Sequence, residues 1–119
     1  MATLQYPSKK DVSSNNLSAN TYYYEPVIAS GETTSDNIQL GGHSVIGVVT
    51  PTMTGASLTV EVSLDGLSWY TLSGVSITVA ADTAFEFAST SMYGWQFIRF
   101  VSASSEGADR TLHVLIKEL

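Results

Sequence analysis

The residues that could support catalysis are few, and their spacing matches no catalytic signature. Gly42-His43-Ser44-Val45 begins like the Gly-x-Ser-x-Gly nucleophile elbow, but Ile46 takes the place of the second glycine. The elbow also requires a helix directly after the serine, whereas the β-branched residues that follow here predict a strand. We therefore expect no serine nucleophile at this position.

The residues that could bind a metal are equally scattered. His43 and His113 lie on different predicted strands, outside any His-x-His pattern or carboxylate cluster, so we interpret both as single surface histidines. Glu106 and Asp109 lie on either side of Gly107, a weak sign of a calcium loop that lacks the full oxygen-ligand pattern. We predict no metal site and no cofactor.

The sequence also lacks the residues for other kinds of catalysis. The chain has no cysteine, which excludes thiolate nucleophiles, disulfides and Cys-ligated metals. Asp65 precedes Gly66, so its carboxylate is expected to cap a turn and not to act as a catalytic acid. No pair of carboxylates has a glycosidase signature, and no glycine loop is suited to phosphate. We predict that the protein is not an enzyme and has no catalytic residues.

Composition and charge limit the classes of partner. The 119 residues are 44% hydrophobic and 13% charged, which is typical of a single globular domain with a modest core. The formal net charge of −6 repels phosphate backbones, so nucleic-acid binding is not expected. No apolar stretch is long enough to cross a membrane, and no apolar run follows the charges near the N-terminus as in a secretory signal.

The segment from Ala56 to Leu72 predicts a β-hairpin around which the other elements are arranged. A period-two pattern marks a strand with one buried face, formed by Leu58, Val60, Val62 and Leu64. Asp65-Gly66 tolerates the positive φ angles of a tight turn. Ser68–Leu72 then forms the return strand, with Trp69 covering the turn.

Further strand-like runs follow at roughly even spacing. They cover 21–28, 38–40, 43–50, 75–79, 85–87, 93–101 and 111–117. Pro26 places the first run at a sheet edge or breaks it, and Gly47 suggests a bulge in a central strand. Trp95, Phe97 and Phe100 give the most aromatic run, typical of a strand in the middle of a sandwich. We predict an all-β fold, a single antiparallel β-sandwich or jelly roll of about eight or nine short strands.

Residues 1–20 differ from the domain at 21–119. Their apolar residues show no sustained period, which fits either a disordered tail or an extended arm that orders on a neighbouring subunit. Leu4, Tyr6 and Leu17 are spaced like anchors of an extended peptide. Together with the one basic pair, Lys9-Lys10, they are the candidate inter-subunit contacts of this segment. Three tyrosines open the domain (Tyr22, Tyr23 and Tyr24), for which core packing, subunit contact and sugar stacking remain open.

Two segments carry a resemblance to known proteins. Val62-Ser63-Leu64-Asp65-Gly66-Leu67-Ser68-Trp69 and Trp95-Gln96-Phe97-Ile98-Arg99-Phe100-Val101 resemble the Ser-x-Asp-Gly-x-x-Trp hairpin and the aromatic-Ile/Val-Arg strand of discoidin-like β-sandwiches. The same pairing is similar to small β-sandwich proteins of tailed-bacteriophage virions. In either case Arg99 is expected to lie among aromatic rings, stacking on one or pairing with a carboxylate.

The resemblance implies a structural role in a virion. The expected function is a capsid decoration protein, made in the host bacterial cytoplasm and bound to the capsid exterior. Its expected partners are further copies of itself, as a dimer or trimer, and a major capsid protein. The alternatives are a neck, tail or head-fibre component and a small carbohydrate-binding module.

Overall fold

The computed structural model describes residues 10–11, 21–88 and 91–118, which form strands and connecting turns without a helix. Most of the predicted arm, residues 1–9 and 12–20, lies outside this description, and with it the candidate contacts Leu4, Tyr6, Lys9 and Leu17. The strands are β1 (Lys10–Asp11), β2 (Thr21–Tyr24), β3 (Val27–Ile28), β4 (Ile38–Gln39), β5 (His43–Thr50), β6 (Ser57–Ser63), β7 (Tyr70–Thr78), β8 (Thr83–Glu86), β9 (Phe97–Ser102), β10 (Arg110–Thr111) and β11 (His113–Glu118).

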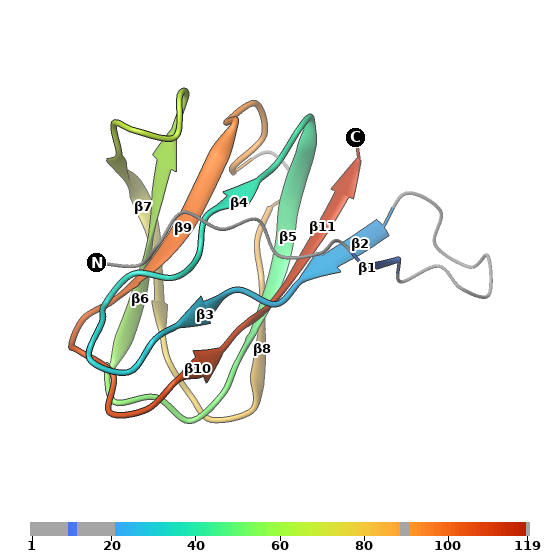
Figure 1. Cartoon of the computed structure of the whole chain (residues 1–119). Coiled ribbons are helices and arrows are strands. Elements are labelled where there is room, and N and C mark those ends of the chain that lie inside the picture. Colours follow the sequence, from blue (N-terminus) through green and yellow to red (C-terminus); the bar gives the residue numbers. More distant parts are fainter. Residues whose placement is uncertain (1–9, 12–20, 89–90, 119) are drawn as a thin grey trace.

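The strands form two antiparallel layers with jelly-roll topology. One layer has the order β1-β2-β11-β5-β8 and the other the order β4-β9-β6-β7 (Figure 1). Without β1, the two four-stranded orders are β2-β11-β5-β8 and β4-β9-β6-β7. Successive strands change layer at every connection except the β6–β7 hairpin, apart from the short β3–β10 pair, and this order of two interlocked Greek keys defines the jelly roll. The short β3–β10 pair joins the layers near one end. The predicted antiparallel β-sandwich or jelly roll is confirmed.

Alternating apolar residues on the facing sides of the layers form one core. Val45, Val114 and Ile116 come from the five-stranded layer, while Val60 and Phe100 come from the opposite one, and all five are fully buried. The residues predicted for the core that are buried are Leu58, Val60, Val62 and Phe100, while Trp95 and Phe97 are half-buried. The period-two pattern therefore identified the inner face correctly.

Leu64 departs from that pattern, and its predicted burial is wrong. β6 ends at Ser63, whose hydroxyl accepts hydrogen bonds from the backbone N–H groups of Asp65 (3.2 Å) and Gly66 (2.8 Å). These bonds turn the chain one residue before the apolar alternation ends, so Leu64 points into solvent. The connection is consequently a six-residue loop, 64–69, and not a two-residue turn.

β7 is one strand where the sequence suggested two. Leu72 and Val75 belong to a bulge in which four residues, 72–75, lie opposite the single residue Val60 of β6. Gly74 permits the bulge because its φ of 82° is a backbone conformation that other residues rarely adopt. Pairing with β6 resumes at Ser76 after the bulge, so the strand continues to Thr78.

The predicted irregularity at Gly47 is confirmed. The register between β5 and β11 shifts at Leu115/Ile116, which are opposite Gly47 and Val45 and leave Ile46 as the extra residue. A Cβ at Gly47 would lie 3.2 Å from the carbonyl oxygen of Phe85 on β8. Glycine therefore allows β8 to approach this central strand closely.

Candidate interaction surfaces

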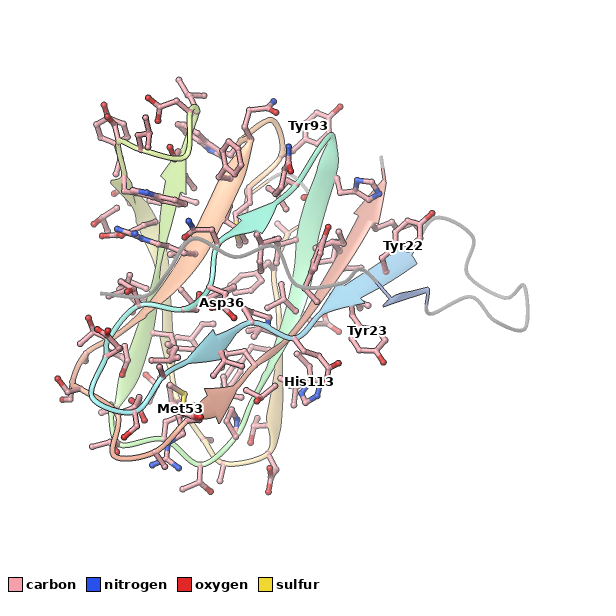
Figure 2. All side chains as sticks on the ribbon, in the orientation of Figure 1. Tyr22, Tyr23, Asp36, Met53, Tyr93 and His113 are labelled. Atoms are coloured by element: carbon pink, nitrogen blue, oxygen red, sulfur yellow. The ribbon has the colours of Figure 1, made fainter. Side chains whose placement is uncertain are left out.

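One end of the sandwich displays large apolar side chains to solvent. Three side chains make up this surface, which we call the apolar tip: Leu64 (65% exposed), Leu67 (82%) and Tyr70 (60%). A fourth exposed side chain, Tyr93 (53%), lies at the same end of the sandwich beside the end of β5 (Figure 2). The first three belong to the β6–β7 loop and its exit, and Tyr93 belongs to the loop before β9. Ser63 pairs with Phe97, so both loops lie at the same end of the four-stranded layer (Figures 1 and 2).

The β6–β7 loop is held in one conformation by its own polar groups. The Oδ1 atom of Asp65 accepts hydrogen bonds from the backbone N–H groups of Leu67 (2.8 Å) and Ser68 (2.9 Å), which confirms its predicted capping role. These two bonds lower the pKa of Asp65 below its ordinary value, and the bond from Ser68 has the larger effect. Gly66 takes a φ of 79°, as the turn requires. The tip is therefore presented on a preorganised loop.

Trp69 and Arg99 fasten this loop to the sheet. The guanidinium carbon of Arg99 lies 4.2 Å from the centroid of the Trp69 ring, within the range of a cation–π contact. Arg99 also forms an ion pair with Glu61, its cross-strand neighbour, at 2.7 Å. Both predicted interactions of Arg99, stacking and pairing with a carboxylate, are confirmed.

A second surface is a hollow on the outer face of the five-stranded layer. It has a volume of about 420 Å³. Its floor is at Gly47, which pairs with Leu115 on one side and Glu86 on the other and has no side chain to fill the space between them. Val49 and His113 form part of its wall. The lining combines apolar side chains with a carboxylate and an imidazole, a mixture that suits a small polar ligand.

The three tyrosines divide between the two faces of β2. Tyr22 and Tyr24 point inward against the core, and burial raises the pKa of Tyr24. Tyr23 is on the outer face, with its ring centroid 6.5 Å from that of His113 (Figure 2). His113 in turn lies 3.3 Å from a carboxylate oxygen of Glu25. Tyr23 is therefore the one of the three tyrosines that faces outward.

The outer edge of β2 is already partly occupied. The predicted break at Pro26 is present, since β2 ends at Tyr24 and β3 begins at Val27. Beyond β2, however, Lys10 pairs with Tyr23 and Asp11 pairs with Tyr22. A neighbouring chain would have to displace β1 before it could pair with these two tyrosines.

Glu106 has a structural role that the sequence did not reveal. It is fully buried, and its carboxylate accepts hydrogen bonds from the backbone N–H groups of Thr54 (2.7 Å) and Gly55 (3.0 Å) and the Ser102 hydroxyl (2.6 Å). Arg110 adds an ion pair at 3.0 Å. Burial acts to raise the pKa of Glu106, but these donors outweigh it and hold the value at about 2.

This arrangement argues against the calcium loop suggested by Glu106 and Asp109. Both oxygens of Glu106 already accept hydrogen bonds, and Asp109 Oδ1 accepts one from the backbone N–H of Ser30 at 2.8 Å. Across residues 10–11, 21–88 and 91–118, no group of three His, Asp or Glu side chains is placed to hold a metal ion. The loop is a structural junction between the two layers.

The prediction of two surface histidines is wrong for His43. Its side chain is buried, its Nδ1–H donates to the carbonyl of Leu40 at 2.9 Å, and its ring meets Tyr22 edge-on at 5.4 Å between centroids. His43 therefore closes the end of the sandwich after Gly41-Gly42. His113 is about half exposed, as expected. Ser44 is fully buried, which is unsuitable for a nucleophile.

No known protein-family model matches this chain, and no curated protein sequence matches it either. Within the described strands and loops, no helix is long and apolar enough to span a membrane.

Because no family or relative was found, function must be inferred from the surfaces of the molecule. The most distinctive of these is the apolar tip, because it places three large side chains in water on a constrained loop and its exit.

Proposed function

We propose that this protein is a non-enzymatic structural component of a virion, and specifically a capsid decoration protein of a tailed bacteriophage. In this role it binds the exterior of the assembled head and stabilises it. The apolar tip is the observation that carries the proposal. Its side chains are more than half exposed in the isolated chain, and a protein partner that covered them would remove them from water.

The tip has the properties of a protein-binding anchor. Tyrosine and leucine side chains supply large contact areas, and tyrosine is enriched at interfaces. The Asp65 and Ser63 hydrogen bonds fix the loop before binding, so little conformational entropy is lost on docking. A loop of this kind suits a surface that must recognise a repeated site on a lattice.

The charge of the chain supports an exterior position. A formal net charge of −6 opposes contact with packaged nucleic acid. The expected partners are a major capsid protein and further copies of this chain, which would be made together in the host cytoplasm.

Stabilisation of the head would follow from mass action. A subunit that binds the assembled lattice and not the free capsid protein stabilises each site by RT ln(1 + [L]/Kd), about 2.7 kcal/mol at a free concentration of one hundred times Kd. A capsid offers many such sites, so modest binding at each one produces a large total effect. No chemical step is required.

The direct test is co-sedimentation with empty heads assembled from the major capsid protein encoded nearest to this gene. The proposal predicts saturable binding at a fixed ratio to capsid subunits and a higher disruption temperature of the heads. Binding to isolated necks, tails or head fibres instead would favour the alternative virion location. Absence of binding to every virion part would refute the proposal.

Carbohydrate binding is a second candidate, favoured by the hollow at Gly47. Tyr23 and His113 provide aromatic surface near it, and Glu86 provides a hydrogen-bond acceptor. Glycan binding measured by calorimetry should then disappear in Tyr23→Ser and Glu86→Gln. The tip variant Leu67→Ser is the matched control, because it lies on another surface and should bind glycan normally.

A further inference from the structure

A third surface lies where the two layers open between their last strands. A groove of about 360 Å³ runs between β7 and β8, which end the four-stranded and five-stranded layers respectively. Its apolar lining includes Val75 and Ile77 from β7 and Phe85 and Phe87 from β8. Ile77 is buried, but the other three are only half-buried. The groove thus exposes part of the core.

Both walls of this groove are sheet edges. In the ladders of the described strands, β7 pairs only with β6 and β8 pairs only with β5. In an antiparallel edge strand, alternate residues direct their N–H and C=O groups away from the neighbouring strand. An extended segment in the groove would therefore gain main-chain hydrogen bonds as well as apolar contacts, the combination used in strand addition.

The dimensions suit a short strand. The bulge at 72–75 disrupts the first part of β7, so the regular edge next to the groove is Ser76–Thr78. This stretch has three residues and Thr83–Glu86 of β8 has four, about 10 Å and 13 Å at the rise of a β-strand. A guest of four or five residues with apolar side chains at alternate positions would fill the groove.

The N-terminal sequence of the same chain has this pattern. Ala2, Leu4 and Tyr6 are apolar at alternate positions, with Thr3 and Gln5 between them, and Pro7 ends the run. Charge also favours the pairing. Because Met1–Lys10 contribute +2 to the formal total of −6, the other 109 residues carry −8. Glu86, whose side chain lies on the outer face of β8, borders the groove.

Geometry favours a guest from another copy. β1 lies at the opposite edge of the five-stranded layer from β8, four strand spacings or about 19 Å away. Nine extended residues before Lys10 reach about 30 Å. Crossing the layer would consume most of that length and leave about three residues, Met1–Thr3, so Leu4 and Tyr6 would not reach their own groove.

We propose that the groove between β7 and β8 binds residues Ala2–Tyr6 of a second copy, which add a strand at this edge and insert Leu4 and Tyr6 between the layers. This contact would link copies head to tail and close into a ring in a small oligomer. It involves no capsid protein, so it stands apart from the proposed function.

The absence of cysteine makes a disulfide test clean. Full-length Leu4→Cys and full-length Val75→Cys chains, distinguished by isotope labelling, are mixed and mildly oxidised. A bound segment has an effective concentration in the millimolar range. The expected yield of mixed disulfide at micromolar protein is therefore about tenfold or more above that of a control mixture with Thr71→Cys, which lies on β7 outside the groove.

Two further measurements complete the test. A synthetic Ala2–Lys9 peptide should reduce the mixed disulfide in proportion to its concentration. Equal yields from Val75→Cys and Thr71→Cys would overturn the proposal. A Leu4→Cys/Val75→Cys double variant that forms only intramolecular disulfides at the same micromolar concentration would also overturn it. These reactions contain no capsid. A high yield of mixed disulfide would therefore still support the groove contact if the protein failed to bind heads.

Discussion

At the residue scale, Glu106 connects more of the molecule than any motif visible in the sequence. Its carboxylate joins the 54–55 turn, the end of β9 and Arg110 at the start of β10. In the sequence it stands in an ordinary Ser-Ser-Glu-Gly loop, and nothing in its neighbours indicates burial. Its role depends on contacts with residues about fifty positions away, which a local pattern does not encode.

Replacing this carboxylate should destabilise the fold. Glu106→Gln keeps the size of the side chain but removes a charge and places an NH2 donor among existing donors. We expect a loss of about 2–4 kcal/mol in the free energy of unfolding, measured by urea denaturation. Glu86→Gln, at an exposed position, is the control and should change stability by less than about 0.5 kcal/mol.

The same residue should give the protein an acid-sensitive stability. The folded-state pKa of Glu106 is about 2, below the ordinary value of 4.5, so its contribution is fully present above pH 4.5 and is lost as pH falls towards 2. The difference corresponds to about 3 kcal/mol. Unfolding curves from pH 6 to pH 2 should show this loss in the native chain and a much smaller loss in Glu106→Gln. Parallel curves would contradict the assignment.

At the scale of elements, alternation predicted strands well and turns poorly. Leu58, Val60 and Val62 followed the period-two rule because the strand is regular there. Leu64 did not, because the hydroxyl of Ser63 starts the turn early, and a serine at this point looks like any other outward residue in a sequence. His43 was misplaced for a related reason, since its burial depends on Tyr22 from a distant strand.

The bulge in β7 shows a further limit. In the sequence, Ser73-Gly74 reads as a gap between a strand that ends at Leu72 and one that begins at Val75, whereas pairing with β6 makes them a single strand. Gly74→Ala should cost about 1–2 kcal/mol from backbone strain alone, because no atom lies near the added Cβ and φ is 82°. Thermal unfolding would measure it. Gly107→Ala, which meets Thr54 Oγ1 at an ordinary 3.5 Å and lacks a positive φ, should be nearly neutral.

At the scale of the whole molecule, the fold class was predictable and the interaction surfaces were not. Short apolar runs at even spacing, with no helical period, indicated two layers of antiparallel strands. The jelly-roll order, by contrast, depends on which distant strands pair. The groove between β7 and β8 and the apolar tip appear only once that order is known. Residues 1–20, which include the proposed guest, were distinguished from the domain by the sequence alone.

The central claim is that the apolar tip attaches the protein to an assembled capsid, and head binding by tip variants tests it most directly. A Leu67→Ser/Tyr70→Ser variant should bind empty heads about tenfold or more weakly than the native chain, because anchors of this kind each contribute about 1–2 kcal/mol or more. Val49→Ser, an exposed apolar residue on the outer sheet face, is the matched control and should bind normally. Native affinity in the tip variant would contradict the account.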